Sequence, residues 1–263
     1  MPGFVDIHCH LLPGIDDGAS DLKESITMAK MAVEQGVDTI VVTPHQLGAF
    51  GFNRGEEIRQ RTAELQQSLE QHQVPLRVLP GADVRIEDGM VGRLVEGDVL
   101  SLGDYRRHVL LELPHELYFP LEPVLEELRR NGMTGVLSHP ERNAGLLKNQ
   151  GLVEDLVDAG CLMQVTGGSL LGTFGPASQG MAQRMAERGT IHFVATDAHG
   201  PKARRPRMRD AYQATVELAG EEAATLWCST FPRAVAQGMA VPAGRTQVQR
   251  RRSSWSLFGR RAA

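Results

Sequence analysis

Short apolar segments recur along this sequence, and most of them are followed by a stretch with the spacing of an amphipathic helix. Seven segments are rich in β-branched or aliphatic residues and have the length of buried strands. They span residues 4–7, 37–43, 76–79, 109–113, 136–138, 161–165 and 191–195. Strands that alternate with helices predict a parallel sheet. At 263 residues, such a sheet is expected to close into a TIM-like α/β barrel.

The predicted helices separate these strands. They span residues 21–36, 56–72, 121–130, 152–159, 180–188, 208–218 and 221–227. Asp21 and Glu24 have the spacing of a capping box at the start of the first helix. No G-x-G-x-x-G follows the first strand, which argues against an open dinucleotide-binding sheet.

Metal-ligand side chains gather where the predicted strands end. Five histidines lie at or just after strand ends: His8, His10, His45, His139 and His199. Four carboxylates have the same placement: Asp17, Asp83, Glu112 and Asp197. In a barrel, the carboxyl ends of the strands form the active-site face. These nine side chains are therefore expected to meet at one rim.

Imidazoles and carboxylates together bind borderline divalent metals such as manganese, iron and zinc. A single histidine after a strand is more often structural, so each residue alone carries little weight. Glu112 is more informative, because an acid inside an apolar strand is nearly always paired or metal-bound. Two ions held close together can clamp a phosphoryl group during its transfer. Arg142 and Arg205 would suit phosphate oxygens with their forked donors, although each could also be an ordinary surface arginine.

Charge divides the chain unequally. The formal net charge is −4, but the six arginines after residue 241 have no acidic neighbour there, so residues 1–241 are markedly acidic. We expect a catalytic domain over 1–241 and a basic, disordered tail over 242–263. This balance does not suit a nucleic-acid binder. The tail could make weak contact with an anionic membrane surface, although a solvated end is the simpler interpretation.

Cysteine use and hydropathy indicate a cytoplasmic protein. There are only three cysteines, and no window is apolar enough for a membrane span or a secretory signal. None of Cys9, Cys161 and Cys228 has the arginine six positions later that a cysteine phosphatase requires. A covalent phosphocysteine route is therefore excluded.

The motifs resemble a known family. The segment Asp6-Ile7-His8-Cys9-His10 is similar to the opening of the PHP (polymerase and histidinol phosphatase) superfamily. The following Asp16-Asp17-Gly18 resembles its capsule and exopolysaccharide branch, the bacterial manganese-dependent protein-tyrosine phosphatases. Further matches, over about residues 4–240, are Thr43-Pro44-His45, Pro80-Gly81-Ala82-Asp83, Leu111-Glu112-Leu113-Pro114, Ser138-His139-Pro140-Glu141-Arg142, Ala195-Thr196-Asp197-Ala198-His199 and Arg205-Pro206-x-Met208.

The resemblance implies a distorted (β/α)7 barrel with up to three divalent ions, of which manganese is the first choice and iron, zinc, cobalt or magnesium are alternatives. His8, His10 and Asp197 would hold one ion and Asp83 and His139 a second, with Glu112 bridging the two. Asp17, His45 and His199 would hold the third. Arg142 and Arg205 would hold the substrate phosphate. The family usually has glutamate where this chain has Asp83, which is one methylene shorter.

The implied activity is hydrolysis of phosphotyrosine by metal-activated hydroxide, regulating polysaccharide biosynthesis through a bacterial tyrosine kinase. Two alternatives stay open. One is a small-molecule phosphomonoesterase such as a histidinol phosphatase. The other is a regulatory module that binds phosphotyrosine without turnover.

Overall fold

The computed structural model describes residues 3–246, whose strands form two parallel sheets. The smaller has the order β1 (Phe4–Cys9), β2 (Val37–Val42), β4 (Arg77–Leu79). The larger has the order β3 (His45–Gln46), β5 (Asp83–Arg85), β6 (His108–Glu112), β7 (Thr134–Ser138), β8 (Leu162–Thr166), β9 (Phe193–Ala195). Since β3 follows β2 after two residues and β5 follows β4 after three, each pair acts as one interrupted barrel strand.

The two sheets join into one barrel. The backbone N–H of Asp197, just after β9, donates to the carbonyl of His8 in β1 at 2.8 Å, and His10 donates to the carbonyl of Ala198 at 2.9 Å. The buried carboxylate of Asp6 accepts from the backbone N–H of Thr196 at 3.0 Å. Within the described residues, this closure gives a distorted barrel of seven strands and confirms the predicted fold class.

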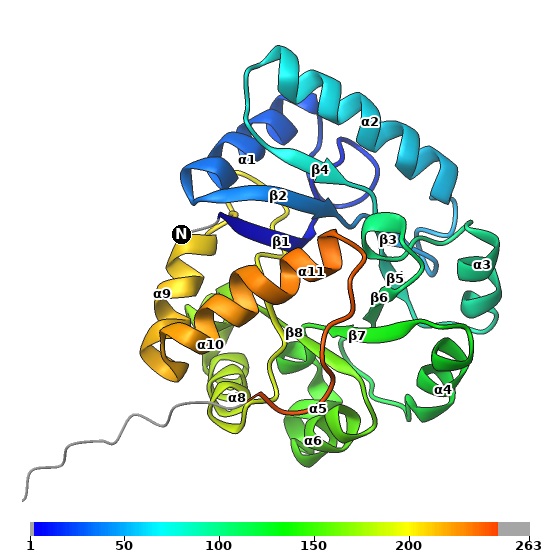
Figure 1. The fold of residues 1–263 in the computed structure, drawn as a ribbon, viewed down its shortest axis with the longest axis vertical. Coiled ribbons are helices and arrows are strands. Elements are labelled where there is room, and N and C mark those ends of the chain that lie inside the picture. The colour runs from blue at the N-terminus through cyan, green and yellow to red at the C-terminus, as the bar shows by residue number, and fades with distance from the viewer. Residues whose placement is uncertain (1–2, 247–263) are drawn as a thin grey trace, which may run out of the picture.

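Helices surround the barrel in Figure 1. The longer ones are α1 (Leu22–Glu34), α2 (Gly55–Gln71), α3 (Met90–Glu96), α4 (Glu122–Arg130), α6 (Gly151–Asp158), α8 (Gly175–Arg188) and α9 (Met208–Ala219). The shorter ones are α5 (Ala144–Lys148), α7 (Gly167–Leu170), α10 (Glu221–Thr225), a π-helical turn η3 (Leu226–Thr230) and α11 (Phe231–Ala236), with 3₁₀ turns η1 (Leu102–Asp104) and η2 (Pro140–Arg142). At the start of α1, Asp21 accepts from Glu24 N–H as predicted, but the Glu24 carboxylate accepts from Ser20 instead of returning to Asp21.

Apolar side chains close the end of the barrel where the strands begin. Val235 and Ala236 of α11 and Leu102 of η1 pack with interior strand residues such as Val136 and Phe193, all of them buried. Figure 1 shows α11 lying across this end of the barrel. The opposite rim, where the strands end, therefore remains as the place for polar side chains.

The chain beyond residue 241 departs from the predicted boundary. Gly244 O accepts from Nε2 of His192 at 2.9 Å, and Thr246 N–H donates to Gly189 O at 2.8 Å. Arg245 forms an ion pair with Asp158 at 3.1 Å. Residues 242–246 thus pack on the domain, because their backbone and Arg245 find partners there. The predicted disorder and membrane contact of the remaining tail lie outside the described residues. Among residues 3–246, no helix has both the length and the apolar character needed to cross a bilayer.

Candidate metal centre

All nine predicted ligands meet at the rim where the strands end. They form four overlapping groups, in each of which one nitrogen or oxygen per residue lies within 4.8 Å of the others. The groups are His10, Asp17, His45 and His199; His8, His10 and Asp197; His8, Asp83 and His139; and His45, Asp83 and Glu112. The sequence predicted this convergence because each residue lies at the end of a predicted strand or in the loop that follows it. That they bind metal stays a prediction.

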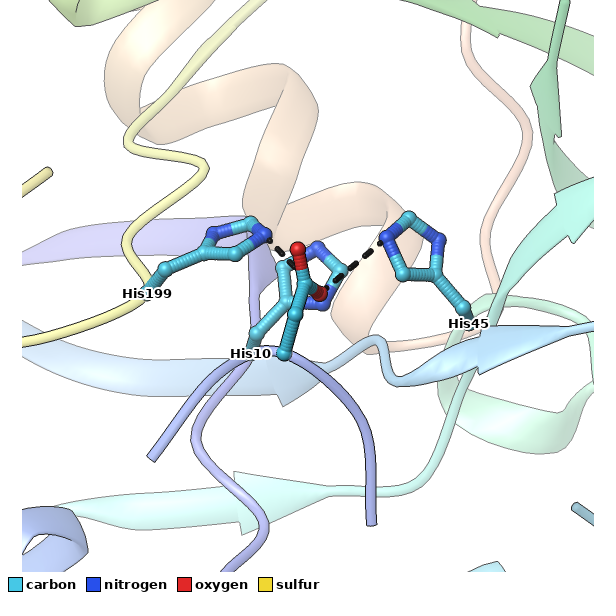
Figure 2. Close-up of side chains that lie close together, drawn as sticks. His10, His45 and His199 are labelled. Atoms are coloured by element: carbon cyan, nitrogen blue, oxygen red, sulfur yellow. Dashed lines mark ion pairs between the residues drawn. The ribbon is translucent and has the colours of Figure 1, made fainter. Parts of the chain in front are cut away.

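Three imidazoles surround Asp17 at the outer side of the cluster. Figure 2 shows the rings of His10, His45 and His199 turned toward one another. One carboxylate oxygen of Asp17 lies 3.5 Å from Nε2 of His45 and 3.5 Å from Nε2 of His199. The Asp17 side chain is 57% exposed, whereas the three rings are mostly covered. This group therefore forms the solvent side of the centre.

Asp197 lies at the centre of the cluster and is buried. Its Oδ1 is 3.2 Å from Nε2 of His8 and 3.6 Å from Nε2 of His10, yet it accepts no hydrogen bond from a described residue. Its Oδ2 accepts one N–H from Arg142 and one from Arg204, each at 2.5 Å. A buried carboxylate oxygen surrounded by imidazole nitrogens and lacking a donor is suited to a cation.

Asp83 reaches the cluster despite its short side chain. Its Oδ2 lies 3.5 Å from both Nε2 of His8 and Nδ1 of His45, and its side chain is fully buried. Neither carboxylate oxygen accepts a hydrogen bond within the described residues. Burial and the neighbouring Asp83 charge raise the pKa of Glu112 to about 7. A divalent cation between these two carboxylates would relieve both the missing partners and the repulsion, so the residues fit a metal site.

Two polar residues orient the rings of the proposed ligands, and neither was predicted from the sequence. Gln164 of β8 places its amide oxygen 2.8 Å from Nδ1 of His8, and Asp16 places a carboxylate oxygen 2.7 Å from Nδ1 of His10. Each ring can therefore donate from Nδ1 and direct its Nε2 lone pair into the cluster. Asp16 also accepts from the backbone N–H of His45 at 3.1 Å and of Gly18 at 3.0 Å. Polar Gln164 inside an apolar strand was the available signal for one, and the Asp16-Asp17 pair for the other.

Two of the ligands have unusual backbone conformations. His139 has φ of 33° and Asp197 has φ of 50°, in the left-handed region that side-chain-bearing residues seldom adopt. His139 directly follows β7, and Asp197 lies two residues after the end of β9. Non-glycine residues in this region cluster at functional sites, where the surrounding structure holds them in place.

The arginines differ from the predicted pair. Arg142 of η2 reaches Asp197, as does Arg204, and their guanidinium carbons lie 4.3 Å and 5.9 Å from the centroid of the Phe174 ring. The predicted Arg205 is exposed, and its Nε donates to the carbonyl of Lys202 at 3.1 Å. The hydrogen bond from His199 N–H to Arg204 O, at 3.0 Å, closes the loop between them and holds Arg204 close to Asp197. The Arg-Arg pair in the sequence did not reveal which of the two turns inward.

The cysteines take no part in the centre. Cys9, Cys161 and Cys228 are free and fully buried. Burial raises the pKa of the Cys161 thiol to about 12 and that of the Cys9 thiol well above its usual range. A protonated, inaccessible thiol is a poor nucleophile, which agrees with the missing C-x5-R pattern.

Comparison with known proteins identifies the family. Residues 4–235 match the family described as "Capsular polysaccharide synthesis, CpsB/CapC". The chain is 38% identical to the tyrosine-protein phosphatase YwqE of Bacillus subtilis over 221 residues, covering 83% of this chain and 86% of that protein. It is 28% identical to the tyrosine-protein phosphatase CpsB of Streptococcus pneumoniae over 227 residues, covering 84% and 93%.

Solved structures agree with these relationships. A crystal structure from a study of YwqE and CpsB, described as "unique metal-dependent tyrosine phosphatases", superposes with a TM-score of 0.87 at 34% identity, covering 94% of this chain and all of that one. The phosphotriesterase homology protein of Escherichia coli, at 11% identity and a TM-score of 0.56, shares the fold alone. The resemblance seen in the sequence is confirmed: this chain belongs to the CpsB/CapC family of capsular polysaccharide synthesis.

Proposed function

We propose that this protein is a metal-dependent protein-tyrosine phosphatase that removes phosphate from a tyrosine kinase of capsular or exopolysaccharide export. The observation that carries the proposal is a buried group of imidazoles and carboxylates whose inner oxygens lack hydrogen-bond donors, beside two inward-turned arginines. The names of the relatives YwqE and CpsB as tyrosine-protein phosphatases support the reaction class.

The ligands would divide among up to three divalent ions, manganese being our first choice. His8, His10 and Asp197 would hold one ion, and Asp83 and His139 a second, matching two of the observed groups. Asp17, His45 and His199, with His10 close by, would hold the third. Glu112 would bridge the first two ions, although in this structure it groups with His45 and Asp83. Mixed nitrogen and oxygen ligands suit manganese, iron or zinc.

Arg142 and Arg204 would hold the phosphate of the substrate. Both guanidinium groups lie beside Asp197, and each engages it through a single terminal nitrogen, so further N–H donors remain for phosphate oxygens. The Nε of Arg204 is buried without a described partner. We therefore assign to Arg204 the phosphate-binding role that the sequence suggested for Arg205. The role of Arg205 stays a prediction, and an experiment must compare the two arginines.

Bound divalent ions would supply hydroxide from water at neutral pH and neutralise the charge of the phosphoryl group. The protein's part is to fix the surroundings. Asp16 and Gln164 hold the imidazoles in one orientation, and the arginines stabilise the equatorial oxygens as the phosphoryl group moves. Because no cysteine is accessible, no phosphocysteine forms. The tyrosine leaves as a phenolate, which requires little assistance because its pKa is about 10.

The direct test combines substrate choice with metal removal. Purified protein is stripped with a chelator, reloaded with manganese, and assayed on matched phosphotyrosine and phosphoserine peptides and on histidinol phosphate. We expect phosphotyrosine to be hydrolysed fastest, only after reloading, and with full activity after treatment with a thiol-alkylating reagent.

The variant His139→Ala supplies the control. Its metal content by mass spectrometry and its circular dichroism are measured together with turnover. A folded variant with undiminished activity, or parent activity that survives chelation, would contradict the proposal. Histidinol phosphate as the preferred substrate would identify a small-molecule phosphatase instead, and phosphotyrosine binding without turnover would identify a binding module.

A further inference from the structure

A basic pocket lies beside the candidate metal centre. It has a volume of about 430 Å³ and is lined by Thr196 and by several residues of the two segments 167–174 and 202–207. Four of its lining residues are cationic: Lys202, Arg204, Arg205 and Arg207. No acidic residue lines it within the described part of the chain. The pocket is therefore suited to a negatively charged group.

The cations differ in how far they are already neutralised. Arg204 is engaged by Asp197, and Arg207 by Asp210 at 2.7 Å. Lys202 and Arg205 form no ion pair with any residue in 3–246. The hydrogen bond from Arg205 Nε to Lys202 O brings these two residues together and leaves the terminal nitrogens of the guanidinium available. Arg205 thus keeps a positive charge for a ligand, and Lys202 adds a second one that the more distant Glu24 carboxylate offsets only in part.

The pocket shares a wall with the phosphate-binding part of the centre. Arg204 lines the pocket and also contacts Asp197. Phe174 lines the pocket as well, and Arg142 stacks on its ring at 4.3 Å. Thr196, another lining residue, directly precedes Asp197. A peptide whose phosphotyrosine reached Arg142 and Arg204 would therefore place a neighbouring side chain at this pocket, since extended residues are only about 3.3–3.6 Å apart along the chain.

We propose that this pocket is a subsite for a second anionic side chain of the same substrate, a carboxylate or a phosphate near the hydrolysed phosphotyrosine. The inference rests on the proposed phosphatase function and adds a sequence preference to it. Lys202 and Arg205 are its specificity-determining residues. The forked donors of Arg205 suit either anion, and both cations lie at the surface, where complementary charge mainly governs selectivity and association.

The experiment measures selectivity within one enzyme preparation. A phosphotyrosine peptide with glutamine at each of the three positions on either side is compared with peptides carrying one glutamate, or one additional phosphotyrosine, at each position in turn. We expect kcat/KM at the best position to exceed that of the glutamine peptide by about fivefold to tenfold. The advantage should shrink as ionic strength rises, because the cations are exposed.

The variant Lys202→Gln/Arg205→Gln should reduce this ratio to about one, and Lys202→Arg/Arg205→Lys should restore most of it. Arg77→Gln is the matched control, because Arg77 is an exposed arginine at the start of β4, at the opposite end of the barrel. The ratio cancels any general loss of activity. If only the phosphotyrosine-bearing peptides gain, the subsite takes phosphate; if both kinds gain, it takes either anion.

A ratio near one in the parent protein at every position, or an undiminished ratio in the double glutamine variant, would overturn the subsite. Failure of the proposed function looks different: no phosphotyrosine peptide would be hydrolysed at all, and the subsite would fall with it.

Discussion

The two ends of the barrel differ in whether their buried polar groups have hydrogen-bond partners. Where the strands begin, the buried ring of His192 accepts from the N–H of Met163 at 3.1 Å and donates to Gly244 O at 2.9 Å, so both nitrogens have partners. Where the strands end, Asp83 and Asp197 keep buried oxygens without donors. An unpaired buried charge is costly, so the second arrangement persists only where something else compensates. One end of the barrel thus stabilises the fold, and the other carries the candidate metal centre.

The largest difference between the ends should appear on neutralising one aspartate at each. Asp197→Asn places an amide nitrogen where one of the two carboxylate oxygens was. Depending on the orientation of the amide, the variant loses either the oxygen that faces the imidazoles or the oxygen that accepts from Arg142 and Arg204. We expect kcat/KM on a phosphotyrosine peptide to fall by about 10³-fold or more, with lower metal content.

The matched control is Asp38→Asn at the other end, where Asp38 pairs with Arg233 at 2.8 Å at the surface. We expect less than about a twofold change in kcat/KM there, because exposed pairs contribute little. Equal losses in the two variants would remove the functional distinction between the ends.

The second prediction separates the two adjacent arginines. Arg204→Ala removes donors beside Asp197, and we expect about a 10²-fold loss of kcat/KM on p-nitrophenyl phosphate, a substrate without flanking residues. For Arg205→Ala we expect the loss of kcat/KM to be at least about tenfold smaller, because the Arg205 guanidinium faces the pocket rather than Asp197. If the loss for Arg205→Ala is the greater, the assignment from the sequence is right and the one from the structure is wrong.

The third prediction concerns Asp16, which does not belong to any of the four ligand groups. Asp16→Asn keeps the shape of the side chain but removes the negative charge of the carboxylate. That carboxylate holds the His10 ring and accepts hydrogen bonds from the backbone N–H groups of His45 and Gly18. We expect the weakest-bound metal ion to dissociate about 10- to 100-fold more readily, measured by competition with a metal-sensitive dye. Asp16→Glu cannot keep the same contacts without moving, so Asp21→Asn, at the exposed start of α1, is the better control. Unchanged metal affinity in Asp16→Asn would reduce Asp16 to a turn residue.

Much of this arrangement was predictable from local patterns. All seven predicted strands exist, because buried parallel strands are continuous apolar runs bounded by polar turns. The convergence of the nine proposed ligands could be predicted because strand ends in a barrel face one rim, whatever their separation in sequence. The two-residue β3 and three-residue β5 were missed, since such short strands have no periodicity. The role of α11 was also missed, because only the closed barrel creates the opening that it covers.

The roles of Asp16 and Gln164 depend on ring orientations that no spacing rule supplies. Which of Arg204 and Arg205 points toward Asp197 depends on the conformation of the loop that carries them. The position of Arg204, where φ is 47°, is set by the closure of that loop on His199 and not by local preference. Residues that act through tertiary geometry are thus the ones that the sequence leaves undetermined.

The smallest expected effect on activity lies at the end of the barrel where the strands begin, because the change expected there is in stability. Burial lowers the pKa of His192 from 6.5 to about 4. Between these values the unfolded chain binds a proton that the folded chain does not. The neutral ring therefore makes its full contribution to the free energy of unfolding above pH 6.5. This contribution is lost as pH falls toward 4 and amounts to about 3 kcal/mol at most.

His192→Gln keeps a side chain that can hydrogen-bond but cannot titrate. Urea unfolding of both proteins at several pH values isolates the residue, because the other titrating groups cancel in the difference. The parent's advantage over the variant should be largest above pH 6.5 and should decrease steadily toward pH 4, while kcat at pH 7.5 stays within about twofold. A difference independent of pH would show that folding does not shift the pKa of His192. His192 would then no longer contrast with the carboxylates that lack partners at the other end.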